Sequence, residues 1–213
     1  MLSARTVRLY IKPPLFVLGL LPALGMLAGA FNYVSLGANP IETIQDTFGN
    51  WALRFIVLTL AISPLRDWTG QPALIALRRM LGLFAFFYVL LHFLTWLLLD
   101  QGLYWPAIVE DIRKRPFITI GFLALLMLIP LAVTSTRGMM RRLGKRWQTL
   151  HQSIYAIAVL AVWHFWWQVK ADYREPLVYA VLIGILLGWR VFKARRTSAS
   201  HRGAHGPQLR EEA

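Results

Sequence analysis

The sequence contains no cysteine among its 213 residues. This absence excludes disulfides, iron–sulfur clusters, thiolate-bound haem and the covalently attached haem that a Cys-x-x-Cys-His motif would carry. Acidic residues are also scarce, with 10 Asp and Glu against 23 Lys and Arg. Any redox cofactor in this chain must therefore be held by histidine, by basic side chains or by hydrogen bonds.

Charged residues of either sign make up only 15% of the chain, whereas 57% of it is hydrophobic and its mean hydropathy is +0.50. The apolar residues occur in long blocks, which is typical of a protein that crosses a membrane several times. A net charge of +13 would suggest nucleic acid as a partner in a soluble protein. Here the basic residues lie between the apolar blocks, so the expected partner is the lipid bilayer and no nucleic acid.

Six apolar segments approach the ~20 residues that a helix needs to cross the hydrocarbon layer. They are Pro14–Phe31, Asn50–Leu65, Arg79–Leu99, Phe117–Val133, Leu150–Val169 and Pro176–Phe192. The expected fold is an all-α, polytopic bundle of six transmembrane helices over residues 14–192. A cytoplasmic N-terminus (1–13) precedes it, and a basic, disordered cytoplasmic tail (193–213) follows it. No internal repeat is evident.

The second segment is the weakest of the six, because it is short and contains Arg54. Asn39 before Pro40 is typical of a helix N-terminus. We therefore predict a short surface helix over Pro40–Phe48 that ends at Gly49, before the second span. The first segment has features of a signal peptide, but five further spans favour an uncleaved helix.

The distribution of basic residues predicts the orientation of the chain. Lys and Arg are frequent in the N-terminus, in the loops after the second and fourth spans, and in the tail. Most of the acidic residues lie in the alternate loops, and the run Arg113–Arg115 is the one exception. By the positive-inside rule, both termini should lie in the cytoplasm.

Two histidines, His92 and His164, lie inside separate apolar segments. Each is 13 residues from the predicted cytoplasmic end of its span, counted from Arg79 and from His151, which corresponds to roughly 20 Å of helix. Two neutral imidazoles at one depth could bind the iron of a haem from its two sides. Alternatively, each could bond a neighbouring helix or belong to a proton relay, as in a transporter or channel. Aromatic residues flank both histidines, as would suit a porphyrin or a membrane interface.

Two runs carry a resemblance to a known family: PLRDWTGQPALIALRRMLGLFAFFYVLLHF and TSTRGMMRRLGKRWQTLHQSIYAIAVLAVWHFWW. They resemble the haem-binding membrane subunits of periplasmic methionine-sulfoxide reductase systems, within the ferric-reductase-like transmembrane family. The resemblance implies a six-helix b-type cytochrome with haem b and FMN in the bacterial inner membrane. It also implies that electrons pass from the quinone pool, or a flavin donor, to a periplasmic molybdenum-cofactor subunit (MsrP-like) in a heterodimer that repairs oxidised proteins.

The same resemblance implies that His92 and His164 are axial ligands of haem iron and that His151 binds a second haem or another cofactor at the inner face. Relatives in the wider superfamily carry two histidines on each of two helices. Counting back from His92 by about one haem-to-haem interval reaches Arg78 and not a second histidine. We therefore expect Arg78 and Arg79, together with the basic cluster 141–146, to hold the phosphate of FMN or a haem propionate, unless these arginines only set the topology.

The expected function is thus that of an electron-transfer subunit without a complete substrate site of its own. A stand-alone transmembrane ferric reductase is the first alternative, although no nicotinamide-binding domain is expected after Arg196. A transporter that relays protons through histidine is the second, and both the absence of an evident internal repeat and the lack of acidic residues within the spans argue against it.

Overall fold

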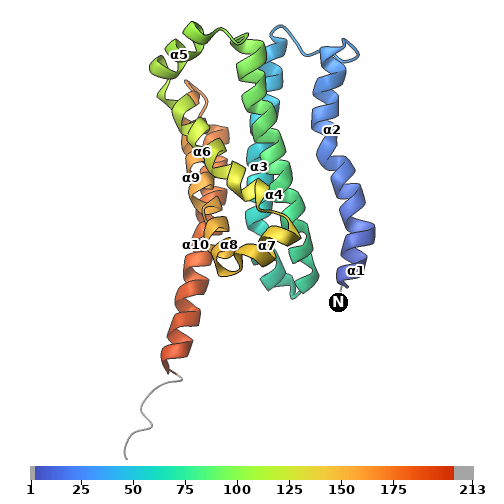
Figure 1. Cartoon of the computed structure of the whole chain (residues 1–213), viewed down its shortest axis with the longest axis vertical. Coiled ribbons are helices and arrows are strands. Elements are labelled where there is room, and N and C mark those ends of the chain that lie inside the picture. Colours follow the sequence, from blue (N-terminus) through green and yellow to red (C-terminus); the bar gives the residue numbers. More distant parts are fainter. Residues whose placement is uncertain (1–2, 204–213) are drawn as a thin grey trace, which may run out of the picture.

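The computed structural model describes residues 3–203, with side chains up to Arg196. All the regular secondary structure in this range is helical, which confirms the predicted all-α class (Figure 1). In chain order the elements are α1 (Ala4–Thr6), the π-helix η1 (Val7–Ile11), α2 (Lys12–Ala30), α3 (Pro40–Thr69), the 3-10 helix η2 (Pro72–Leu74), α4 (Ile75–Leu94), the π-helix η3 (Thr95–Asp100), α5 (Trp105–Lys114), α6 (Pro116–Val133), α7 (Arg137–Leu143), α8 (Lys145–His151), α9 (Ile154–Gln168) and α10 (Arg174–Gly203).

Five continuous helical stretches are long and apolar enough to cross a membrane. They are Ala4–Ala30, Pro40–Thr69, Pro72–Asp100, Pro116–Val133 and Arg174–Arg196. The predicted fifth span, Leu150–Val169, is divided, because α8 ends at His151 and α9 has only 15 residues. At 1.5 Å per residue α9 measures ~22 Å, less than the ~30 Å hydrocarbon layer. The chain is thus a polytopic membrane protein, and a sixth complete span remains a prediction.

The predicted break at Gly49 is wrong, because α3 is one helix of 30 residues. Its N-terminus is where the sequence placed it: the side chain of Asn39 accepts a hydrogen bond from the amide of Glu42 at 3.4 Å. Gly49 lies inside the helix with a histidine ring against it, so that packing outweighs the weak helix propensity of glycine. The span judged weakest is the one most buried by its neighbours, and Arg54 lies exposed over the ring of Trp51.

Helix α2 lies at the side of the bundle against α3 and α4 (Figure 1). A hydroxyl group from α4 joins it to the core: Tyr88 donates a hydrogen bond to the carbonyl of Gly19 at 2.6 Å and accepts one from the amide of Ala23 at 3.3 Å. This carbonyl and amide would bond each other in a regular helix, and Pro22 lies between them. A neighbouring helix thus supplies hydrogen bonds beside the proline.

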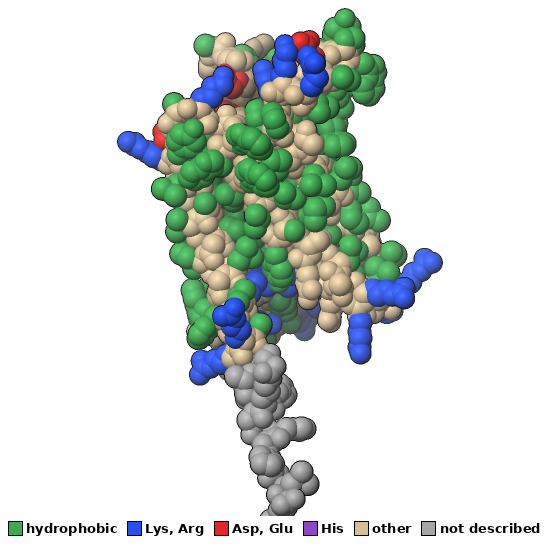
Figure 2. Space-filling model, turned by 90° about the vertical axis from the view of Figure 1, so that its left-hand side faces the viewer, with side chains coloured by type: hydrophobic (Ala, Val, Ile, Leu, Met, Phe, Trp, Pro, Cys, Tyr) green, Lys and Arg blue, Asp and Glu red, His purple; other side chains and the backbone are tan. Residues whose placement is uncertain are grey.

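The bundle has two unlike ends, which we call the α5 end and the α8 end after the helices that lie there (Figure 1). Lys and Arg accompany Asp and Glu at the α5 end, whereas only Lys and Arg are visible at the α8 end, and hydrophobic side chains cover the surface between them (Figure 2). Helix α1 and the last turns of α10 both lie at the α8 end (Figure 1). Helix α10 continues to Gly203, so the predicted disordered tail is helical over residues 193–203. Its remainder, 204–213, lies outside the described residues.

Candidate functional site

His92 on α4 and His164 on α9 face each other inside the bundle. Their ring centres are 6.1 Å apart, and the two ring planes are nearly perpendicular, at 87°. The side chains thus meet from two helices that are 72 residues apart in the sequence. The sequence predicted that the two histidines lie at one depth, and the structure places their imidazoles next to each other.

Hydrogen bonds to backbone carbonyls determine which nitrogen of each ring carries the proton. Nδ1 of His92 lies 2.9 Å from the carbonyl oxygen of Gln45, and Nδ1 of His164 lies 2.7 Å from that of Phe117. A carbonyl only accepts, so each Nδ1 is the donor and each neutral ring keeps its lone pair on Nε2. In metal-binding histidines, a hydrogen bond of this kind from the other ring nitrogen orients the imidazole.

Two glycines allow these close approaches. A Cβ atom at Gly49 would lie 3.0 Å from Nδ1 of His92, and one at Gly121 would lie 2.8 Å from Nδ1 of His164. Each glycine lies four residues after the carbonyl that accepts the hydrogen bond. A side chain at either position would therefore push an imidazole away from its carbonyl.

The two halves of the site are an internal repeat that we did not detect in the sequence. Positions 45, 49 and 92 recur 72 residues later as positions 117, 121 and 164. The repeat includes GNWAL at 49–53 and GFLAL at 121–125, and His-Phe at both histidines. Helices α3 and α4 form one hairpin, and α6 and α9 form the other. A comparison of the sequence with itself at this offset would have revealed the glycines.

The spacing of the rings fits one iron atom between them. An imidazole nitrogen binds a transition metal at about 2 Å, and the ring centre lies about 1 Å behind that nitrogen, so two rings on one metal have centres about 6 Å apart. The side chain of Gln45 is a polar group beside the two rings: its amide nitrogen is 3.4 Å from Nε2 of His92. Its Oε1 is buried without a partner within the described residues. Such an orphaned atom calls for an explanation, and a group bound beside Gln45 would supply one.

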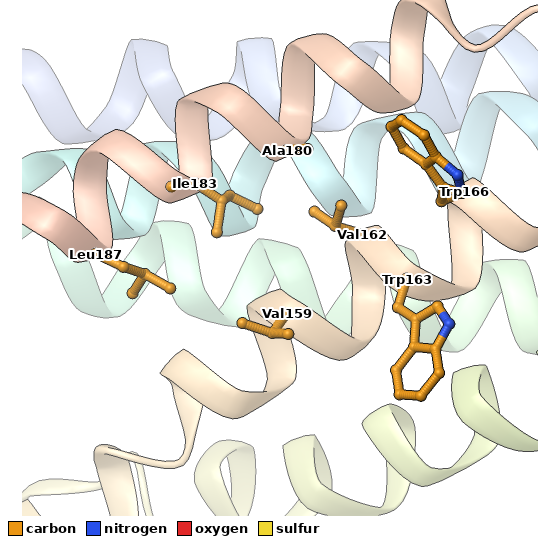
Figure 3. Close-up of a pocket in the computed structure, with 8 residues that line it drawn as sticks. Val159, Val162, Trp163, Trp166, Ala180, Ile183 and Leu187 are labelled. Carbon is orange, nitrogen blue, oxygen red and sulfur yellow. The ribbon is translucent and has the colours of Figure 1, made fainter.

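The tryptophans next to His164 point away from it. Trp163 and Trp166 line an apolar groove of about 290 Å³ between α9 and α10 (Figure 3), and Trp167 is exposed. This groove is lined by Val159, Val162, Trp163, Trp166, Ala180, Ile183, Gly184 and Leu187, with no histidine among them. The indoles of α9 therefore face outward, which favours the membrane-interface alternative for these aromatic residues over contact with a porphyrin.

In His151 the proton lies on the other ring nitrogen, Nε2, and not on Nδ1 as in His92 and His164. The hydroxyl of Thr134 donates to the carbonyl of Pro130 at 2.6 Å, so Nε2 of His151 donates to that hydroxyl at 3.0 Å and the lone pair lies on Nδ1. The ring stacks on Trp147 with centres 3.9 Å apart. The charge of Arg78 lies within electrostatic range of this ring. His151 thus has an indole and an arginine as neighbours, and it does not form the pair of facing rings seen at His92 and His164.

The structure separates the two predicted arginines. Arg78 is partly buried and lies close enough to His151 for their charges to interact, whereas Arg79 is exposed and lies on the side of Lys12. The arginines and lysine at 141–146 are exposed as well. Sequence analysis missed Arg190, a partly buried residue of α10. Its position inside the sixth predicted span was the available signal, because a charge within a span is costly.

The fold and the site together define a class: an α-helical, polytopic membrane protein with a pair of facing imidazoles at the junction of two helix hairpins. Comparison with known proteins then gives the family. Residues 48–162 match the ferric reductase like transmembrane component, a range that contains His92 and His151 and ends just before His164. The chain belongs to this family, and within it to the haem-binding subunits described next.

Three relatives carry the name "protein-methionine-sulfoxide reductase heme-binding subunit MsrQ". The one from Xanthomonas campestris pv. campestris (strain 8004) is 56% identical over 170 residues, which cover 78% of each chain. The one from Xanthomonas euvesicatoria pv. vesicatoria is 56% identical over 168 residues, or 78% of this chain and 77% of the relative. The one from Bordetella pertussis is 52% identical over 193 residues, or 89% of this chain and 92% of the relative.

Proposed function

We propose that this chain is the membrane electron-transfer subunit of a protein-methionine-sulfoxide reductase and that it carries haem b between His92 and His164. One observation carries this proposal: the two imidazoles lie 6.1 Å apart, each with its lone pair on Nε2. When bound, the haem supplies one-electron chemistry, and its potential depends on the axial ligands and on the surrounding apolar residues.

The protein contributes orientation to this site. The carbonyls of Gln45 and Phe117 hold the protonated Nδ1 atoms, which fixes both tautomers and makes Nε2 the metal-binding nitrogen. The glycines at 49 and 121 let the rings reach those carbonyls. Since the carbonyls belong to α3 and α6, each histidine is held by the other helix of its own hairpin.

The direction of transfer follows from the charges at the two ends. We place the basic α8 end in the cytoplasm and the α5 end in the periplasm of a bacterial inner membrane. Electrons from the quinone pool or a flavin donor would then reach a periplasmic molybdenum-cofactor subunit through the haem. The exposed surface of α5 and the segment Glu42–Asp46 are the proposed docking region, because they lie at that end.

Substitution of the ligands tests the haem site. Purified His92→Ala and His164→Ala variants should each lose most of the reduced-minus-oxidised b-type absorbance, and added imidazole should restore part of it. Gln152→Ala, at an exposed polar position beside α8, is the control and should keep the full signal. The ligand assignment would be falsified if both histidine variants retained all their haem.

A stand-alone ferric reductase would show the same haem spectrum, so a second measurement is needed. Co-purification with a periplasmic molybdenum enzyme, and reduction of that enzyme by the haem, support the proposed function. Rapid reduction of ferric chelates without such a partner supports the alternative. The 72-residue repeat removes one objection to a transporter, but the haem-binding relatives favour electron transfer.

A further inference from the structure

Arg190 is a charged residue within a span, and its hydrogen-bond partners are all neutral. Its Nη1 donates to the hydroxyl of Tyr155 at 2.7 Å, and its Nη2 donates to the carbonyl of Leu60 at 3.0 Å and to the hydroxyl of Ser63 at 3.4 Å. The guanidinium lies over the ring of Tyr155. Its Nε is buried and has no hydrogen-bond partner among the described residues. These contacts orient the side chain without neutralising it.

A second arginine, Arg78, adds to the positive charge around Arg190. Arg78 lies within electrostatic range of Arg190, and neither residue belongs to an ion pair within residues 3–196. The nearby carboxylate, Asp67, is bonded to Lys193 at 2.5 Å and to Arg66 at 2.9 Å. Two partly buried arginines without a carboxylate of their own are costly in a membrane protein unless an anion joins them.

We propose that Arg190 and Arg78 bind the oxyanion, a phosphate or a carboxylate, of a planar cofactor at the α8 end. Guanidinium groups suit such oxyanions because they offer paired N–H donors in one plane. Flat side chains border the site on the His151 side, where the imidazole stacks on Trp147.

This site is separate from the one at the facing histidines. Arg78 precedes His92 by 14 residues on α4, or about 20 Å of helix. The inference rests on the proposed function only in taking the chain to carry cofactors. It replaces the exposed Arg79 with Arg190, which comes from another helix, as the partner of Arg78. Two sources share the required chemistry: the phosphate of FMN and a propionate of haem.

Paired ligands with and without the anion test the phosphate source. Flavin-depleted full-length protein is titrated with FMN and with riboflavin, and binding is followed by flavin fluorescence. We expect the wild type to prefer FMN about 10- to 100-fold, as for charge-assisted hydrogen bonds, and Arg190→Gln to abolish the preference. Arg190→Lys should keep part of it. Arg195→Gln, at an exposed position on the same helix, is the matched control and should keep all of it.

Reconstitution with protohaem and with its dimethyl ester tests the carboxylate source. A loss of haem at the α8 end with the ester, and the same loss in Arg190→Gln with protohaem, would assign the anion to a propionate. Equal binding of FMN and riboflavin, together with equal binding of haem and its ester, overturns the proposal even if the Arg190→Gln variant does not fold. The spectrum of the His92–His164 haem is recorded throughout, so that failure of the haem assignment is distinguishable from failure of this site.

Discussion

Each facing histidine depends on a glycine on the neighbouring helix. Gly49 and Gly121 are important because glycine has no side chain. A methyl group at position 49 or 121 would lie 3.0 or 2.8 Å from the imidazole. Contacts this short force the ring or the helix to move, and extra atoms in a packed interior cost about 1–3 kcal/mol. Since the ring also bonds the carbonyl four residues before that glycine, its displacement would turn Nε2 away from the proposed haem site.

We predict that Gly49→Ala and Gly121→Ala each reduce haem content and shift the reduction potential or the absorbance of the haem that remains. Gly25→Ala is the control, because a Cβ there has no neighbour within 4 Å, and it should leave haem unchanged. Haem content and redox titration of the purified variants provide the measurement. Normal haem and an unchanged potential in both variants would show that the glycines do not position the rings.

At the scale of the element, helices α2 and α4 depend on one hydroxyl group. Tyr88 is fully buried and bonds the carbonyl of Gly19 and the amide of Ala23 beside Pro22. Its removal leaves two backbone groups of α2 without this partner in an apolar setting, where a buried unsatisfied group costs about 1–3 kcal/mol. The effect should be on the attachment of α2, since neither histidine lies on α2.

We therefore expect Tyr88→Phe to lower the thermal stability of the detergent-solubilised protein while its haem absorbance stays normal at low temperature. Tyr10→Phe is the control, because Tyr10 is 74% exposed, and it should unfold at the wild-type temperature. The measurement is the unfolding temperature followed by circular dichroism. An unchanged temperature for Tyr88→Phe would mean that the bridging hydrogen bonds contribute little.

Helix α5 also belongs to this scale, because it forms part of the proposed docking region. Asp111 holds it in place by accepting hydrogen bonds from the indole of Trp96 at 3.1 Å and the amide of Gln101 at 3.3 Å, and by pairing with Arg115 at 3.0 Å. Glu110 is more exposed and pairs only with Lys114 of the same helix among the described residues. A change at Glu110 therefore alters surface charge without releasing α5.

Charge reversal by Glu110→Lys should slow reduction of the periplasmic partner several-fold at low ionic strength, because exposed charges act mainly on association rates. Haem content should not change. The rate is measured by stopped-flow reoxidation of the reduced haem, and Arg174→Glu, at another exposed charge of the α5 end, tests whether location on α5 matters. An unchanged rate in Glu110→Lys would remove this face of α5 from the docking region.

For the whole molecule, the unequal charge of the two ends predicts the orientation in the membrane. The absence of cysteine provides a direct test, because a single introduced thiol is the only one in the chain. Asp100→Cys places it at the α5 end, and Lys145→Cys places it at the α8 end, both at exposed positions. A membrane-impermeant maleimide should label the first variant in cells with permeabilised outer membranes and the second only after lysis. The reverse pattern would invert the proposed direction of electron transfer.

Much of the fold was predictable because a bilayer imposes strong rules on sequence. Long apolar blocks, the charge asymmetry and the two histidines within spans are local or compositional features, so His92 and His164 could be named without coordinates. The break expected at Gly49 was wrong because helix propensity is weaker than tertiary packing. The repeat went unseen because it consists of a few positions at a spacing of 72 residues, between apolar residues that are interchangeable.

The sequence by itself determined the class of protein and the two histidines that we propose as haem ligands, because the hydrophobic effect and the cost of buried polar groups act on residue types. Only the tertiary structure decided which groups meet. It placed the imidazoles 6.1 Å apart, directed Nδ1 of each to a carbonyl, turned the tryptophans of α9 outward, and brought Arg190 rather than Arg79 towards Arg78. These outcomes depend on helix rotation and on contacts between distant segments, which residue type and local spacing do not specify.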